Sequence, residues 1–145
     1  MKERTKVLLV DDNRAEAELT RIAYMEMGIP AEVVYCKNGE HFLGLLQQGQ
    51  IPLDEINYIL MDMNMPPMDG SEVLKILSAH ENWRLLPVII FTSSDRSDEI
   101  QASYQWGAKA YVIKPLDMDK LYETVQFIHN FWGKLNVQPL SESVC

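Results

Sequence analysis

The stretch Ile56-Asn57-Tyr58-Ile59-Leu60-Met61-Asp62 places a run of strand-forming apolar residues directly before one carboxylate. The next eight residues, Met63-Asn64-Met65-Pro66-Pro67-Met68-Asp69-Gly70, contain two prolines and a glycine that end the strand at once. In an open parallel sheet, ligands bind beyond the carboxyl ends of the strands. The stretch therefore predicts a buried strand that delivers Asp62 to such an end, where a carboxylate can be a metal ligand, a nucleophile or both.

Short apolar runs alternate with amphipathic stretches along the rest of the chain. Val7-Leu8-Leu9-Val10 is typical of a buried strand, and a helix is predicted from its cap at Asn13 to Met27, before Gly28-Ile29-Pro30. The other predicted strands are 31–36, 87–91 and 109–113; the other predicted helices are 39–48, 71–80, 95–106 and 117–132; a polar loop is predicted over 47–57. Five strand–helix units indicate an α/β fold, a doubly wound five-stranded parallel sheet with helices on both faces.

Length, composition and charge exclude several classes of protein. The 145 residues suit one domain, and we expect it to span residues 1–133, followed by a polar tail at 134–145 and no second domain. The net charge of -8 argues against nucleic-acid binding. No apolar run approaches the roughly 20 residues that cross a bilayer. Only two cysteines, Cys36 and Cys145, are present, so we expect a cytoplasmic protein without disulfides and a buried Cys36.

Carboxylates also follow the first predicted strand, as Asp11-Asp12. Strands one and three flank the same crevice in a doubly wound sheet, so Asp11, Asp12 and Asp62 should meet at one edge. Unpaired, the three would repel one another, and at least one pKa would rise. A hard divalent cation such as Mg²⁺ resolves the repulsion, and it prefers one or two carboxylates together with phosphate oxygens.

Two further strand ends supply partners for a phosphoryl group. The strand at 87–91 is followed by Thr92, a hydroxyl, and the strand at 109–113 is followed by Lys114-Pro115, an ammonium. A hydroxyl and an ammonium both suit phosphate oxygens. Phosphoryl transfer depends mostly on positioning and charge neutralisation, and a carboxylate such as Asp62 can serve as its nucleophile.

Over about residues 5–133 the chain resembles the receiver domains of two-component response regulators, in particular stand-alone CheY-like ones. The residues that carry the resemblance are Asp11-Asp12, the stretch from Asp62 to Gly70 with Pro66 and Asp69-Gly70, Thr92, Tyr111 and Lys114-Pro115. The resemblance implies a flavodoxin-like (βα)5 fold with the strand order 2-1-3-4-5.

The resemblance also implies a function and roles for single residues. Asp62 would accept a phosphoryl group from a sensor histidine kinase or a histidine phosphotransfer protein, and Lys114 would pair with the phosphate. Mg²⁺ would be bound by Asp11, Asp12, Asp62 and the backbone carbonyl of Asn64. Thr92 and Tyr111 would switch conformation. Such a protein signals by conformational change and protein–protein binding, and its own catalysis is limited to slow autodephosphorylation, on which Asn64 and Ser94 are expected to bear.

The last predicted helix carries more apolar surface than one sheet face needs. Leu121, Val125, Ile128 and Trp132 form a stripe, and Tyr122, Phe127 and Phe131 widen it to roughly 220°. Either the tail folds back over this surface or another chain covers it; we expect a homodimer through the fourth helix, fifth strand and fifth helix, with Trp106 joining the surface. The aromatic end of this helix resembles small regulators paired with bacterial phytochromes. We expect His41, His80 and His129 to lie at the surface.

Three other functions fit parts of the pattern. An Asp-nucleophile phosphatase of the haloacid-dehalogenase type needs a second acid two residues after its nucleophile, where this chain has Asn64. A flavodoxin-like cofactor carrier needs a phosphate-binding loop after strand one, where Asp11-Asp12 would repel a phosphate. A receiver-like scaffold that is never phosphorylated is opposed by the complete set of site residues.

Overall fold

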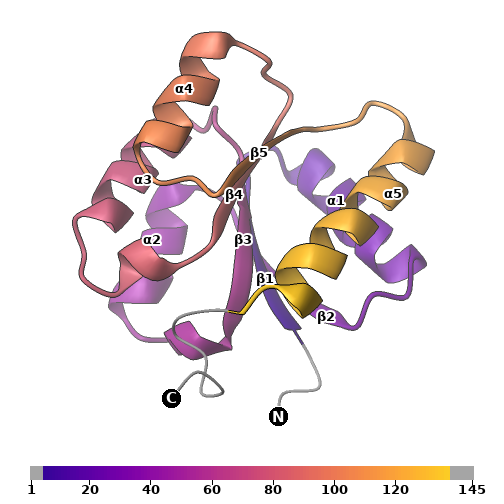
Figure 1. Cartoon of the computed structure of the whole chain (residues 1–145), viewed down its shortest axis with the longest axis horizontal. Coiled ribbons are helices and arrows are strands. Elements are labelled where there is room, and N and C mark those ends of the chain that lie inside the picture. The colour runs from indigo at the N-terminus through magenta and orange to yellow at the C-terminus, as the bar shows by residue number, and fades with distance from the viewer. Residues whose placement is uncertain (1–4, 138–145) are drawn as a thin grey trace.

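The computed structural model describes residues 5–137 of the chain. Its centre is one parallel sheet of five strands in the order β2-β1-β3-β4-β5, as the resemblance implies (Figure 1). The strands are β1 (Thr5–Val10), β2 (Ala31–Cys36), β3 (Ile56–Met61), β4 (Val88–Thr92) and β5 (Ala110–Ile113). The predicted α/β fold is therefore confirmed, and each strand lies where the sequence predicts it to within two residues.

Five α-helices cover the two faces of the sheet, α1 and α5 on one side and α2, α3 and α4 on the other (Figure 1). They are α1 (Arg14–Glu26), α2 (Gly39–Gln47), α3 (Gly70–Ser78), α4 (Ser97–Gln105) and α5 (Met118–Ile128). Short 3₁₀ turns at Leu53–Glu55 and Trp83–Leu85 precede β3 and β4, the first of them inside the predicted loop. Within residues 5–137, no helix is long and apolar enough to span a bilayer.

Side-chain caps set the starts of the helices that follow the strands. Asn13 caps α1, Asn38 caps α2 and Asp117 caps α5, each through a side-chain oxygen that accepts a backbone N–H of the first turn. Asp69 forms a capping box with Glu72 at the start of α3. Because each cap directly follows a loop at the carboxyl end of a strand, the caps also shape those loops.

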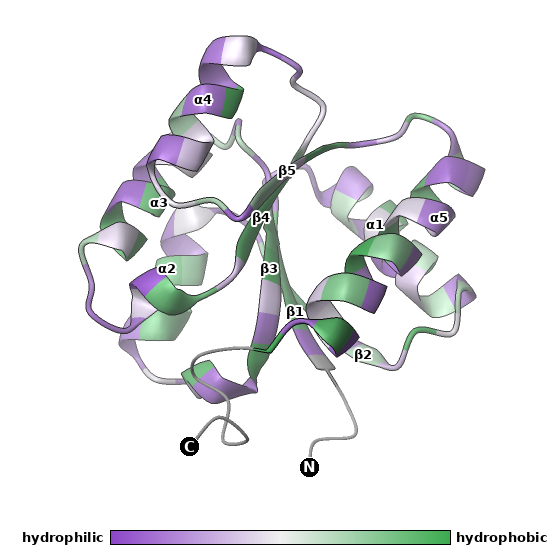
Figure 2. Cartoon of the chain, viewed as in Figure 1, coloured by the Kyte–Doolittle hydropathy of each residue, from purple (hydrophilic) through white to green (hydrophobic). Residues whose placement is uncertain are grey.

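The sheet separates two apolar cores, and its strands are strongly hydrophobic (Figure 2). Leu8 and Val10 of β1 face the core under α2 and α3, whereas Val7 and Leu9 face the core under α1 and α5. Cys36 is fully buried, as predicted, and burial raises the pKa of its thiol to about 12. The central strands are thus held on both faces, which makes their carboxyl ends a rigid platform.

The last predicted helix departs from a regular α-helix. The α-helical part ends at Ile128, and a π-helix continues from His129 to Leu135. The prediction that His129 lies at the surface is wrong: only 1% of it is exposed. Its Nδ1 lies 3.1 Å from the Tyr58 hydroxyl, which in turn lies 2.7 Å from the Tyr24 hydroxyl. A buried polar chain therefore links α1, β3 and the π-helix.

Gly133 makes this burial possible, because it lies against the imidazole ring. A Cβ added at Gly133 would come within 2.5 Å of His129 Cε1. The wide turn of the π-helix and the missing side chain at Gly133 together leave room for the ring. Neither can be read from apolar periodicity. His41 and His80 are partly exposed, closer to the expectation.

The buried histidine predicts a pH-dependent stability. Burial lowers the pKa of His129, and the nearby Lys134 ammonium lowers it further. His129 therefore takes up a proton less readily in the folded state than in the unfolded chain. Since the unfolded chain binds this proton below about pH 6.5, the free energy of unfolding should decrease as pH falls below that value. His129→Phe keeps a ring and leaves Tyr58 its bond to Tyr24. Between about pH 7.5 and pH 5.5, the free energy of unfolding of this variant, measured in urea, should decrease less than that of the wild type. His41→Gln is the control. If His129→Phe shows the same decrease as the wild type, the prediction is contradicted.

Gly70 predicts a second stability effect, at the junction of the loop after β3 with α3. Its N–H donates to the Met63 carbonyl at 2.8 Å, and an added Cβ would lie 2.8 Å from the Asp62 carbonyl oxygen. Gly70→Ala should therefore destabilise the protein by about 1–3 kcal/mol, because backbone must move. Gly44→Ala, in the interior of α2 with no atom within 4 Å, should instead stabilise by roughly 0.5–1 kcal/mol. If chemical denaturation gives Gly70→Ala and Gly44→Ala the same free energy of unfolding as the wild type, both expectations are contradicted.

Candidate functional site

Backbone pairing brings the carboxyl ends of four strands to one edge of the sheet. The Asp62 N–H donates to the Val10 carbonyl at 2.9 Å, and the Asp11 N–H donates to the Cys36 carbonyl at 3.1 Å. On the other side, the Lys114 N–H donates to the Thr92 carbonyl at 2.7 Å. Between these pairs, β3 pairs with β4 through Met61 and Ile90. The residues that directly follow β1, β3 and β5, together with the last residue of β4, therefore lie along one edge.

Asp11, Asp12 and Asp62 form a compact acidic cluster. Each offers a carboxylate oxygen, and these oxygens all lie within 4.8 Å of one another. Asp11 and Asp62 are buried and Asp12 is exposed, so the cluster is open on one side. The structure thus brings the three predicted carboxylates together. A set of oxygen donors with one side open to solvent fits a hard divalent cation that keeps some of its water.

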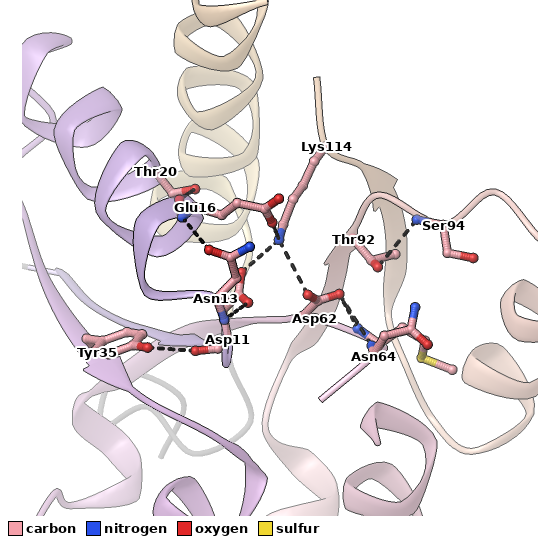
Figure 3. A network of polar contacts seen from close by, with 11 residues as sticks. Asp11, Asn13, Glu16, Thr20, Tyr35, Asp62, Asn64, Thr92, Ser94 and Lys114 are labelled. Atoms are coloured by element: carbon pink, nitrogen blue, oxygen red, sulfur yellow. Dashed lines mark hydrogen bonds and ion pairs between the residues drawn. The ribbon is translucent and has the colours of Figure 1, made fainter. Parts of the chain in front are cut away.

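Lys114 supplies the positive charge at this cluster (Figure 3). Its Nζ lies 2.7 Å from Asp11 Oδ2, 2.8 Å from Glu16 Oε1 and 3.5 Å from Asp62 Oδ2, and only 9% of its side chain is exposed. Burial alone would lower the pKa of Lys114, but the hydrogen bonds to Asp11 and Glu16 outweigh it and raise this pKa. Burial also raises the pKa of Asp11, which the Lys114 ammonium opposes.

The two carboxylate oxygens of Asp62 have different partners: one accepts backbone N–H groups, and the other faces the Lys114 ammonium. Its Oδ1 accepts the Met63 N–H at 2.7 Å and the Asn64 N–H at 3.4 Å. Its Oδ2 faces Lys114 at 3.5 Å, within ion-pair range. Asn64 therefore lies beside Asp62, and its own side chain is exposed.

Thr92 and Tyr111 both contact the loop that follows β4. The buried Thr92 accepts the Ser94 N–H through its Oγ1 at 3.4 Å, and the Tyr111 hydroxyl donates to the Ser94 carbonyl at 2.9 Å. The Ser94 hydroxyl in turn donates to Glu99 of α4. A change at Thr92 or Tyr111 would therefore act directly on the segment between β4 and α4.

Two residues that bond to Asp11 and Lys114 do not appear among the sequence predictions. Tyr35 donates its hydroxyl to the Asp11 carbonyl at 2.8 Å, and Glu16 accepts from Lys114. Only Glu16 left a signal in the sequence: it lies three residues after the predicted helix cap Asn13, whose side chain accepts the Glu16 N–H at 3.1 Å. This position in the first turn of α1 places Glu16 near the strand ends. The sequence does not show that its carboxylate pairs with Lys114, because that depends on where the fold places Lys114.

Comparisons with known proteins agree with this geometry. Residues 7–126 match the response regulator receiver domain family. The chain is 32% identical to the probable methanogenesis regulatory protein FilR2 of Methanothrix harundinacea, over 92% of this chain and 86% of that protein. It is 31% identical to response regulator Rcp1 of Synechocystis, over 87% of each.

Solved structures give the same result. The phosphorylated cyanobacterial phytochrome response regulator RcpA aligns with a TM-score of 0.84 and 29% identity, over 94% of this chain and 99% of that one. The Mn²⁺-bound form of Rcp1 aligns with a TM-score of 0.81 and 29% identity, over 93% and 99%. The strand order, the carboxylates at the strand ends and these matches lead to one conclusion: the chain belongs to the response regulator receiver domain family of two-component signalling.

Proposed function

We propose that Asp62 accepts a phosphoryl group from the phosphohistidine of a sensor histidine kinase or a histidine phosphotransfer protein, in the presence of Mg²⁺. The observation that carries the proposal is the acidic cluster of Asp11, Asp12 and Asp62 with the Lys114 ammonium on its inner side. It combines a nucleophile, a place for a cation and a fixed positive charge within a few ångströms. Membership of the receiver family and the likeness to phosphorylated RcpA support it.

The proposed transfer needs little chemistry from the protein besides positioning. A carboxylate oxygen of Asp62 attacks the phosphorus, and an O–P bond forms as the bond from phosphorus to the donor imidazole nitrogen breaks. That nitrogen keeps the electron pair, and the imidazole leaves neutral because its second nitrogen carries a proton. Lys114 stabilises the charge on the phosphoryl oxygens, and it needs to move only a short distance from its place 3.5 Å from Asp62.

The side chains of Asp11, Asp12 and Asp62 and the backbone carbonyl of Asn64 would hold the Mg²⁺. The donor set fits, since it offers carboxylate oxygens on one open rim. The bound cation would neutralise charge on the transferring group. The similar structure of Rcp1 in a Mn²⁺-bound form supports the proposal that this chain binds a divalent cation.

We further propose that the phosphoryl group is read out through Thr92 and Tyr111. Thr92 is buried beside the site, and both residues are bonded to Ser94. If Thr92 turns toward the phosphate, it gives up the Ser94 N–H, and the segment before α4 must adjust. Partners that bind the surface around α4 and β5 would then sense the change.

The proposal predicts that the protein takes up one phosphoryl group from acetyl phosphate with Mg²⁺, seen as a mass increase of the intact protein. Asp62→Asn should abolish the uptake because an amide is a poor nucleophile. Asp98→Asn removes the same charge from an exposed site on α4 and should label like the wild type. Undiminished labelling of Asp62→Asn, or labelling of the wild type without any divalent cation, would contradict the proposal.

We also propose that the chain forms a homodimer through α4, β5 and α5. β5 lies at one edge of the sheet, with α4 on one face and α5 on the other (Figure 1). These elements and the segments that directly follow β5 and α5 expose large apolar side chains. The exposed fractions are 50% for Tyr104, 48% for Ile113, 100% for Leu116, 70% for Phe127 and 49% for Phe131. Such a concentration of exposed apolar surface is typical of an interaction site.

Trp106 does not belong to this surface, contrary to expectation. It packs against the core on the α2–α3–α4 face, and Lys75 of α3 lies over its ring at 4.9 Å from the centroid. Trp106 directly follows α4, and the core that it joins lies on the face of the sheet opposite α5. The proposed interface is therefore formed by the exposed side chains of Tyr104, Ile113, Leu116, Phe127 and Phe131.

Light scattering after size exclusion tests the dimer. Phe127→Glu places a charge in the proposed interface and should shift the protein to the monomer, with and without beryllofluoride and Mg²⁺. Met25→Glu places the same charge on an exposed apolar side chain of α1, outside the elements of the proposed interface, and should leave the dimer intact. A wild type that stays monomeric at high concentration in both states would refute the dimer.

A further inference from the structure

The Lys114 ammonium has a partner that the proposed phosphoryl transfer does not need. Glu16 Oε1 lies 2.8 Å from Lys114 Nζ, nearly as close as Asp11 Oδ2 at 2.7 Å, whereas Asp62 Oδ2 is at 3.5 Å. The ammonium therefore donates hydrogen bonds to Asp11 and Glu16, and its contact with Asp62 is a longer ion pair (Figure 3). Glu16 draws Lys114 toward α1.

Local structure fixes the backbone of Glu16. Its N–H donates to the side chain of the cap residue Asn13 at 3.1 Å, and its carbonyl accepts from the buried Thr20 hydroxyl at 3.2 Å. Glu16 is the third residue of α1, so both bonds lie within the first two turns of that helix. If the ammonium of Lys114 moves toward Asp62, the backbone of Glu16 cannot follow, and its carboxylate can follow only as far as the side-chain torsions allow, so the movement works against the 2.8 Å bond between the two side chains.

The three carboxylates around Lys114 differ in what else can compensate them. Asp11 and Asp62 belong to the cluster that fits a divalent cation, but Glu16 does not. The side chain of Glu16 is 43% exposed, so water can solvate it when the ammonium leaves. Glu16 is therefore the partner that Lys114 can give up. A cation bound at the cluster would compensate Asp11 and Asp62 but not Glu16, so the attraction between Glu16 and Lys114 would persist.

We propose that Glu16 is a positioning residue for Lys114: it holds the ammonium beside α1 while Asp62 is unmodified, and it opposes the movement of Lys114 to a phosphoryl group on Asp62. This inference rests on the proposed function. A phosphoryl group brings more negative charge than the carboxylate that carries it, and so draws Lys114 away from Glu16. Lys114 must give up its bond to Glu16 to reach the phosphoryl group. The strength of that bond therefore reduces the net attraction between Lys114 and the phosphoryl group.

Beryllofluoride, which mimics the phosphoryl group, measures this competition. At saturating Mg²⁺, Glu16→Gln should bind beryllofluoride about two- to fivefold more tightly than the wild type, the size expected for a partly exposed ion pair. Titration calorimetry gives the affinity. Glu18→Gln removes the same charge from the same helix, where Glu18 pairs with Arg21, and should match the wild type.

Two further variants separate a specific contact from a general effect of charge. Glu16→Asp keeps the charge but shortens the side chain, so it should bind beryllofluoride like Glu16→Gln. In a Lys114→Met background, Glu16→Gln should change the affinity by less than about 1.5-fold, because its effect passes through Lys114. A wild-type affinity in Glu16→Gln or Glu16→Asp, or the same gain in the Lys114→Met background, would overturn the inference.

A readout without beryllofluoride keeps this test distinct from the test of the proposed function. A crystal structure of Glu16→Gln without Mg²⁺ or beryllofluoride should show the Lys114 ammonium closer to Asp62 Oδ2 than the 3.5 Å of the wild type, and Glu18→Gln should keep the wild-type distance. An ammonium that stays in its wild-type position in Glu16→Gln would overturn the role of Glu16 directly. Failure of the wild type to bind beryllofluoride would instead contradict the proposed phosphorylation of Asp62.

Discussion

The site is organised by the repulsion between buried carboxylates at one edge of the sheet. At an effective dielectric constant near 20, two charges at the 4.8 Å limit between Asp11 and Asp62 repel by about 3 kcal/mol. Lys114 compensates that repulsion from the inner side, and the open side toward Asp12 leaves room for a cation. Such a site can accept an added negative group only if its positive charges, Lys114 and a bound cation, can rearrange around that group. A signalling switch requires a rearrangement of this kind.

The fold supplies what holds such a cluster together. The strands that carry Asp11 and Asp62 are buried on both faces and hydrogen-bonded to each other, so neither carboxylate can move away from the other. Gly70 closes the loop after β3 against the Asp62 carbonyl. By contrast, Thr92 and Tyr111 contact, through Ser94, a largely exposed segment without regular secondary structure before α4. The proposed acceptor Asp62 is thus held by rigid strands, and the proposed response would be directed to a loop.

The resemblance to receiver domains implies the sheet order. The residues at the strand ends predict the convergence of Asp11, Asp12 and Asp62, because strand-end position in a parallel sheet decides which residues meet. The sequence does not predict the partners of Lys114, since a flexible four-carbon side chain can reach any of several carboxylates and only the fold selects Glu16. His129 is the clearest error. Its burial depends on a π-helix and on the absent side chain of Gly133, which leave no mark in apolar periodicity.

A crystal structure of the protein with Mg²⁺ and beryllofluoride tests the central claim most directly. We expect beryllium bonded to an Asp62 carboxylate oxygen, the cation held by Asp11 and Asp12, and the Lys114 ammonium moved from Glu16 to a fluorine. A structure in which beryllofluoride is absent from Asp62 at saturating concentration would contradict the assignment of Asp62 as the phosphoryl acceptor.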